Sequence, residues 1–310
     1  MTVDHTADTA TPLRTELSVD GDARVKLVVN EPTLCNPTDM QMSATERSVV
    51  RTALRQVAVA GVSCLVTFLI GSAFGTQVTL IEVAPALLPL EDADCSAELA
   101  KSFKKRKIDV LTGAKIGNVK AAKNGVTLSV DAGGEKKELK VEVVLVAAGR
   151  AANVENIGLE KAGVKLTERG FIKINERLET SAKGIYAIGD VAGPPMLAHK
   201  GSREGMVLAE LLAGQKAHLV NYGNIPSATY CHPEVASIGL TEQQCKEKKL
   251  DYKVGKFPFS ANGRARTSGE TEGFVKIIRD AKYGEILGAH IIGAPATELI
   301  HELVVARENE

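Results

Sequence analysis

Residues 180–205 read TSAKGIYAIGDVAGPPMLAHKGSREG and place one acidic side chain in a turn flanked by glycine. The apolar run 185–188 predicts a buried parallel strand that ends at Gly189 and Asp190. Open α/β sheets bind their ligands beyond the carboxyl ends of the strands, so Asp190 lies at a predicted binding edge. Its carboxylate can accept hydrogen bonds from ligand hydroxyl groups, and Gly189 allows the backbone to pass close to the ligand.

A second element follows this turn. The Gly-Pro-Pro sequence at 193–195 turns the chain into a helix that we expect to begin near Met196, with free amide groups at its first turn. The 26-residue string resembles the second flavin-binding motif of the pyridine-nucleotide disulfide oxidoreductases, and its MLAHK run is similar to the dihydrolipoamide dehydrogenases among them. A generic strand, turn and helix is the alternative. The resemblance implies that FAD is bound by Gly189, Asp190, Met196, Leu197, Ala198 and His199.

The resemblance extends from about Phe74 to Glu310 and implies an α/β fold. We expect a Rossmann-like FAD/NAD(P)-binding domain followed by an α+β dimerisation domain. Residues 1–56 are unassigned and predicted to be partly disordered, 57–150 form the NAD-binding domain, 151–221 the return segment of the FAD-binding domain, and 222–310 a truncated dimerisation domain.

Composition restricts the class of protein. With 310 residues and 44% hydrophobic content, the chain is long enough for two or three packed domains. Its 38 basic and 38 acidic residues cancel, so we expect neither a nucleic acid nor an anionic membrane as partner. The five cysteines are irregularly spaced, with no C-x-x-C and no recognisable metal set, which favours a reducing, cytoplasmic location: Cys35, Cys64, Cys95, Cys231 and Cys245.

The stretch 57–76 contains twenty residues without a charge and is long enough to span a bilayer. The alternative is a buried strand, turn and helix of a nucleotide-binding domain. The run leads directly into a predicted strand at 78–81, which favours the second interpretation. The polar segment 1–22 lacks an apolar core and does not resemble a secretory peptide.

The strand at 78–81 ends at Glu82, where a Rossmann unit places the acidic residue that accepts hydrogen bonds from the adenosine ribose. A carboxylate there repels a 2′-phosphate, and 83–89 contains no Arg or Lys to compensate. NAD is therefore preferred over NADP.

The glycine turn before this strand departs from the family pattern. Its three glycine positions fall on Val59, Gly61 and Cys64, of which Gly61 alone is glycine. Either this site binds NAD poorly, or the segment is altered relative to a working ancestor. The resemblance also implies an adenine contact at the backbone of Ile116. Gly149 is predicted to pass close to the nicotinamide or to form a plain interdomain turn.

The remaining elements are predicted from periodicity and capping. We expect a helix at 96–106, a hairpin or meander around 131–134, a capped helix from Thr241 with Gln244, and a final helix at 295–307. His232 is interpreted as a structural residue. The predicted strands lie at 108–111, 143–146, 227–230, 235–238, 252–257, 274–278 and 286–292.

The resemblance implies an enzyme that oxidises dihydrolipoamide, free or on a lipoyl-bearing protein, with NAD through FAD. That chemistry needs two cysteines spaced C-x-x-x-x-C, and no pair in this chain has this spacing. The family's catalytic histidine segment would follow Glu310. His301 and Glu302 are adjacent, so they point about 100° apart on a helix. No catalytic residue is therefore assigned.

Three functional hypotheses follow. The first is a flavoprotein oxidoreductase of the dihydrolipoyl dehydrogenase type, incomplete as this chain. The second is a non-catalytic nucleotide-binding or dimerisation module, either homodimeric or paired with a full-length relative through 222–310. The third is an inactive truncated product. No metal is expected in any of them.

Overall fold

The computed structural model describes residues 27–30, 77–147 and 149–310. The uncharged stretch 57–76, Gly61 and its neighbours, and the predicted disorder near the N-terminus lie outside the described residues. Within the described ranges, no helix is both long and apolar enough to cross a membrane.

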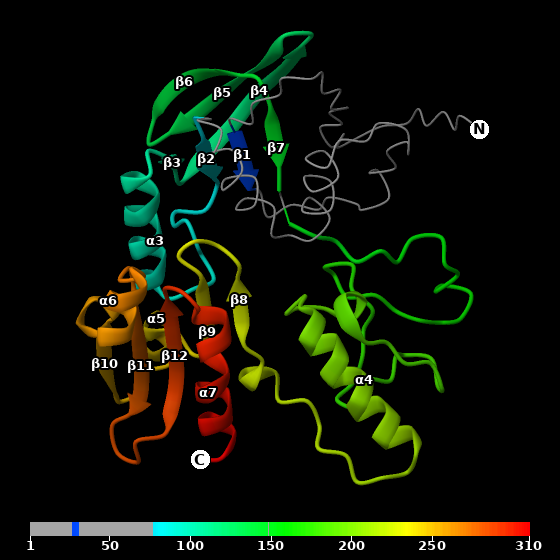
Figure 1. The fold of residues 1–310 in the computed structure, drawn as a ribbon. Helices are drawn as coiled ribbons and strands as arrows, with labels where there is room; N and C mark the ends of the chain where they lie inside the picture. The colour runs from blue at the N-terminus through cyan, green and yellow to red at the C-terminus, as the bar shows by residue number, and fades with distance from the viewer. Residues whose placement is uncertain (1–26, 31–76, 148) are drawn as a thin grey trace.

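A parallel sheet forms the first part of the described chain, with the strand order β3-β2-β1-β7 (Figure 1). Its strands are β1 (Leu27–Asn30), β2 (Thr79–Glu82), β3 (Asp109–Leu111) and β7 (Val144–Val146). Helix α3 (Ala93–Lys105) follows β2 and contacts β3. The alternation of parallel strands and helix confirms the predicted α/β class, and the strands predicted near 78–81, 108–111 and 143–146 are present.

The start of helix α3 differs from its predicted position at residue 96. The helix begins three residues earlier, because the Asp92 side chain caps it by accepting a hydrogen bond from the Asp94 amide at 3.1 Å. Asp94 is also the acidic residue of the first turn. Lys104 and Lys105 lie in the last turn, as the helix dipole favours.

An antiparallel meander of three strands extends from the parallel sheet: β4 (Ala114–Ala122), β5 (Gly125–Ala132) and β6 (Glu135–Val141). The predicted hairpin at 131–134 is confirmed, and it turns through Gly133 and Gly134 with φ of 63° and 86°. One face of β5 packs on the parallel sheet through Val126, Leu128 and Val130.

The segment 149–221 contains little regular structure besides the 3₁₀ turn η2 (Gly189–Ala192) and helix α4 (Ala198–Leu212). The predicted buried strand at 185–188 is wrong. Its residues make one isolated antiparallel bridge, and Ile185 and Ile188 are 39% and 37% exposed. A parallel strand is buried only where neighbours flank it, and no parallel strand lies beside 185–188 in the described part of the chain. The predicted start of α4 at Met196 is two residues early, because Leu197 is still extended.

The C-terminal part is an antiparallel sheet with the order β10-β11-β12-β9-β8. All five strands were predicted: β8 (Ser227–Thr229), β9 (Val235–Gly239), β10 (Tyr252–Pro258), β11 (Phe274–Asp280) and β12 (Ile286–Ile292). Its helical elements are η3 (Tyr222–Asn224), α5 (Glu242–Glu247), η4 (Phe259–Ala261), α6 (Gly263–Ser268) and α7 (Ala296–Glu308). The predicted capping box of Thr241 and Gln244 is confirmed, and α7 buries Ile300 against β9 and β12.

Helix α3 joins the two sheets and lies between them in Figure 1. Its buried Leu99 and Phe103 share one apolar cluster with Val235, Phe274 and Ile292 of the C-terminal sheet. Beside this cluster, Arg106 donates a hydrogen bond to the His232 carbonyl at 2.8 Å. No contact in the described chain gives the His232 ring a ligand role. Its carbonyl instead helps to hold α3 against the C-terminal sheet, and we call this contact between α3 and the sheet the joint.

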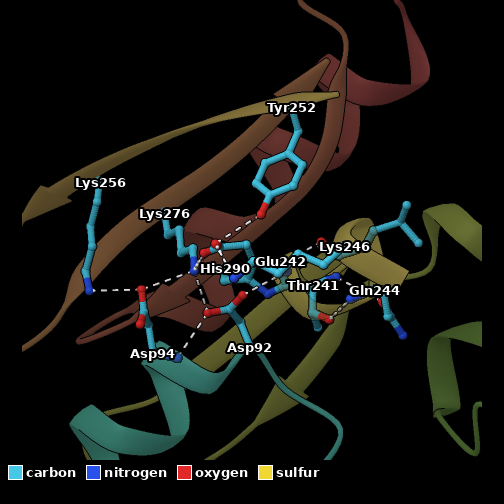
Figure 2. A network of polar contacts seen from close by, with 11 residues as sticks. Asp92, Asp94, Thr241, Glu242, Gln244, Lys246, Tyr252, Lys256, Lys276 and His290 are labelled. Atoms are coloured by element: carbon cyan, nitrogen blue, oxygen red, sulfur yellow. Dashed lines mark hydrogen bonds and ion pairs between the residues drawn. The ribbon is translucent and has the colours of Figure 1, made fainter. Parts of the chain in front are cut away.

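A buried ammonium group closes the same joint (Figure 2). Lys276 on β11 is 2% exposed and donates to Asp92 at 2.8 Å, to Glu242 at 2.8 Å and to Asp94 at 3.1 Å. Three acceptors satisfy the three donors of one ammonium group. We call these four residues the Lys276 network. Two lysines at its margin, Lys246 and Lys256, balance the remaining carboxylate charge.

Candidate functional site

The turn Gly189–Gly193, called here the Asp190 turn, is presented at the start of helix α4. Gly189 has φ of 75°, and no atom lies within 4 Å of the position that a Cβ would take there. The conformation therefore requires glycine, while the space beside it is open. The Asp190 side chain is 45% exposed, so its carboxylate is accessible to a ligand.

Arg150 joins Gly149 to the Asp190 turn. It directly follows Gly149, whose φ is 96°. Its guanidinium lies 3.3 Å from the Asp190 carboxylate and also donates to the Met196 carbonyl. The chain that leaves β7 is thereby held against the Asp190 turn. Arg150 was not predicted as a site residue, although its position directly after a predicted close-approach glycine is a signal that could have indicated it.

Helix α4 is bonded to the backbone of the Asp190 turn through two buried charged side chains. Lys200 Nζ donates to the Gly189 carbonyl at 2.8 Å and to the Gly193 carbonyl at 2.9 Å, and it forms an ion pair with Glu204 at 3.2 Å. Glu204 Oε2 accepts a hydrogen bond from the Gly189 amide at 2.7 Å. Both side chains are at most 1% exposed. We call them the Lys200–Glu204 pair, and neither was predicted as a site residue.

The close approach of α4 depends on Gly201. A Cβ at this position would lie 3.2 Å from the Gly189 Cα, which is tighter than ordinary contact. The N-cap Leu197 makes no side-chain capping bond, so no side chain at the cap occupies the amides of the first turn. Met196 and Leu197 are partly buried, whereas Ala198 and His199 are exposed. His199 Nε2 lies 2.8 Å from the Pro226 carbonyl oxygen, which orients its ring toward the C-terminal part.

Two of the residues predicted to bind NAD, Glu82 and Ile116, lie on the parallel sheet and the meander, apart from α4 (Figure 1). Gly149, also predicted to contact NAD, instead precedes Arg150 beside the Asp190 turn. Glu82 ends β2, is 3% exposed, and accepts a hydrogen bond from the Ala84 amide at 2.8 Å. Ile116 lies on β4 and packs against the cluster that contains Ile81, so it is close to the same end of the sheet. Gly61 is outside the described residues. The predicted sites thus form two groups, one around Glu82 and one around Asp190.

The three cysteines of the described chain are free and buried, and burial raises the pKa of each thiol. For Cys231 the pKa reaches about 12, through burial and the nearby Glu234 carboxylate. A thiol becomes a nucleophile only as the thiolate, so Cys95, Cys231 and Cys245 are unsuited to disulfide exchange. Within the described ranges, no group of three His, Cys, Asp or Glu side chains could hold a metal ion.

Comparison with known proteins agrees with this architecture. A sequence model described as pyridine nucleotide-disulphide oxidoreductase matches residues 23–205, and the dimerisation domain of the same family matches residues 225–310. The chain therefore belongs to the pyridine nucleotide-disulphide oxidoreductase family.

Similar curated proteins are named dihydrolipoyl dehydrogenase. The dihydrolipoyl dehydrogenase of Zymomonas mobilis is 47% identical over 239 residues, and that of Thermus scotoductus is 47% identical over 236 residues. Each alignment covers 76% of this chain and 51% of the relative. The chain thus spans about half the length of the curated relatives it matches.

A solved structure shows the same fold. The HOCl-induced flavoprotein disulfide reductase RclA of Escherichia coli has a TM-score of 0.73 at 24% identity, covering 92% of this chain and 58% of that one.

The Asp190 turn fits an FAD molecule. It offers an accessible carboxylate for hydroxyl groups, a glycine with open space beside it, and a helix start without a side-chain cap. Glu82 lies at the end of β2, where a Rossmann unit places the acceptor for the adenosine ribose of NAD. Unlike Asp190 it is buried, and one of its carboxylate oxygens accepts from the Ala84 amide.

Proposed function

We propose that this chain is the cofactor-binding and dimerisation part of a flavoprotein oxidoreductase of the dihydrolipoyl dehydrogenase type, with FAD and NAD as cofactors. The observation that carries the proposal is the Asp190 turn, which presents an accessible carboxylate directly before the uncapped start of α4. The identity of 47% to dihydrolipoyl dehydrogenases over this region supports the choice of branch.

Each residue has a defined part in this proposal. Asp190 accepts hydrogen bonds from the ribityl hydroxyls of FAD, and the first amides of α4, near Met196 to His199, face its ring system. Glu82 accepts from the NAD ribose, with Ile116 beside the adenine and Gly149 where the chain passes the nicotinamide. Bound FAD supplies the two-electron transfer between a dithiol and NAD.

The whole reaction oxidises dihydrolipoamide to lipoamide, and NAD takes up the hydride equivalent while one proton is released. The step at the dithiol needs an enzyme disulfide. The chain has no C-x-x-x-x-C, and its three described thiols are buried. We propose that the chain alone does not turn over dihydrolipoamide, and that it acts as a homodimer or paired with a full-length relative. Free, buried cysteines fit a cytoplasmic location.

The absorption spectrum of the purified chain, before and after incubation with FAD and gel filtration, tests the cofactor proposal. Retained visible flavin bands are expected, together with their loss in Asp190→Ala. A wild-type chain that stays colourless would refute a working flavin site. NAD reduction by the chain alone with dihydrolipoamide would refute the incomplete-enzyme part.

The second candidate is a non-catalytic module that pairs with a full-length relative. The antiparallel sheet of the C-terminal part favours it, because all five strands form and bury a core that includes Ile238 and Ile291 without help from the cofactor groups. Co-expression with a full-length dihydrolipoyl dehydrogenase and gel filtration would test it. A mixed dimer supports this candidate, and two separate species would refute it.

A further inference from the structure

Lys200 and Glu204 are the only buried charged residues in the described segment 149–221. Neither belongs to the residues assigned above to FAD or NAD. Burial of a charged group is costly unless it is paired and hydrogen-bonded, so two such groups behind an exposed turn require an explanation.

We propose that Lys200 and Glu204 are positioning residues for the FAD site. They hold the Asp190 turn in the conformation that presents the Asp190 carboxylate. Tyr222 extends this support to the dimerisation domain. The inference rests on the proposed function, since it concerns the same cofactor site.

The pair contacts both ends of the Asp190 turn. One ammonium group bonds the carbonyls of Gly189 and Gly193, and the carboxylate of Glu204 accepts from the Gly189 amide. The backbone on either side of Asp190 is therefore bonded to one rigid helix. Without the pair, Gly189 could adopt other conformations, because a glycine is restricted so little by its own sterics.

Tyr222 links the pair to the C-terminal part. Its hydroxyl donates to Glu204 Oε1 at 2.8 Å from η3, at the start of the C-terminal part. Burial and the bonded Glu204 carboxylate raise the pKa of Tyr222, so the hydroxyl remains a donor. Glu204 therefore contacts three parts of the chain: the Asp190 turn, Lys200 on its own helix, and the entrance to the C-terminal sheet. Any shift of that sheet relative to α4 acts on the turn through this carboxylate.

The test compares Lys200→Met, Glu204→Gln and Tyr222→Phe with Lys276→Met as a matched control. The control removes an equally buried ammonium that does not contact the Asp190 turn. Two quantities are measured on the full chain: FAD affinity from quenching of flavin fluorescence, and amide hydrogen exchange of peptides covering 189–193.

We expect Lys200→Met and Glu204→Gln to weaken FAD binding about tenfold or more and to speed exchange at 189–193 by a similar factor, the scale of one lost charge-assisted hydrogen bond. Tyr222→Phe should cause a change of about threefold, because it removes one neutral donor. With Lys276→Met, FAD affinity and exchange at 189–193 should stay within about twofold of the wild-type values, although this variant lowers the stability of the whole chain.

The inference is overturned if FAD affinity and local exchange do not change in the two charge variants, or if Lys276→Met changes them equally. Should Lys200→Met fail to fold, Tyr222→Phe decides the question with the same readouts. A wild-type chain that takes up no FAD refutes the proposed function and the cofactor role of the pair together. The exchange data then still show whether the pair holds the turn, because that readout needs no cofactor.

Discussion

Lys200 and Lys276 are 1% and 2% exposed, yet their partners lie at very different distances along the chain. The partners of Lys200 lie 4, 7 and 11 residues away in the sequence. Those of Lys276 lie 34, 182 and 184 residues away. A buried cation with local partners shapes one turn, whereas one with distant partners joins parts of the chain that lie far apart in the sequence.

The two sites also differ in charge. Lys200 faces one carboxylate and two carbonyl groups, whereas Lys276 faces three carboxylates. Burial by itself would lower the pKa of Lys276. The hydrogen bonds to Asp92, Glu242 and Asp94 outweigh this effect and raise the pKa above its ordinary value. Loss of this ammonium would therefore leave like charges facing one another, which is not so at Lys200.

The largest effect is expected from Lys276→Met, which leaves Asp92 buried without its cation. We expect the free energy of unfolding to fall by about 3–5 kcal/mol, measured by urea denaturation. Lys256→Met is the control, because Lys256 contacts Asp94 at 3.2 Å from a position 44% exposed and should cost less than about 1 kcal/mol. Equal losses in the two variants would contradict the description of Lys276 as the centre of the joint.

A double-mutant cycle at Lys200 and Glu204 should show a coupling energy of about 1–3 kcal/mol, because each single change leaves the other charge buried and unpaired. The cycle combines Lys200→Met with Glu204→Leu and uses denaturant midpoints. The exposed pair Lys101–Glu98 on α3 is the control, with an expected coupling of about 0.5 kcal/mol or less. Additive losses at Lys200 and Glu204 would rule out an energetically coupled pair.

Acid should weaken the Lys276 network in a defined interval. Hydrogen bonds from Lys276 and Lys246 lower the pKa of Glu242 to about 2, from an ordinary value of 4.5. A carboxyl group with a lowered pKa contributes its full stability above its ordinary value, and this stability is lost as the pH falls toward the folded value. We expect a loss on the order of 2 kcal/mol between about pH 4.5 and pH 2, measured from urea midpoints. Glu242→Gln should show a shallower decline, and identical pH profiles would show that Glu242 does not contribute.

The smallest effect concerns the backbone contact behind the Asp190 turn. Gly201→Ala should lower the free energy of unfolding by about 1 kcal/mol, because its Cβ would press on Gly189. Gly205→Ala is a matched control one turn later. Its Cβ would meet Ile188 at 3.5 Å, an ordinary contact, so the better helix propensity of alanine should stabilise by about 0.5 kcal/mol. Thermal denaturation of both variants checks the sign, and stabilisation by Gly201→Ala would refute the close approach.

Local signals predicted much of the fold. The capping box at Thr241, the hairpin at 131–134 and the five C-terminal strands each depend on a few neighbouring residues, and each is present in the structure. The prediction of a buried strand at 185–188 was wrong because it depended on residues that are distant in the sequence. An apolar run is buried as a parallel strand only if other strands lie beside it, and that condition is not local. The start of α3 was missed because two nearby polar residues, Asp92 and Ser96, both resemble N-caps.

By itself, the sequence determined the fold class, the family, and the turn that carries Asp190, because glycines, capping residues and short-range periodicity act over a few residues. It also contains the 4-residue spacing of Lys200 and Glu204, which places the two side chains on one face of a helix. Only the tertiary structure decided that this pair bonds both ends of the Asp190 turn, that Arg150 meets Asp190, and that Lys276 joins three carboxylates across the chain. The physical reason is that a buried charge must find its partners in space, and no local pattern records how the folded chain brings distant residues together.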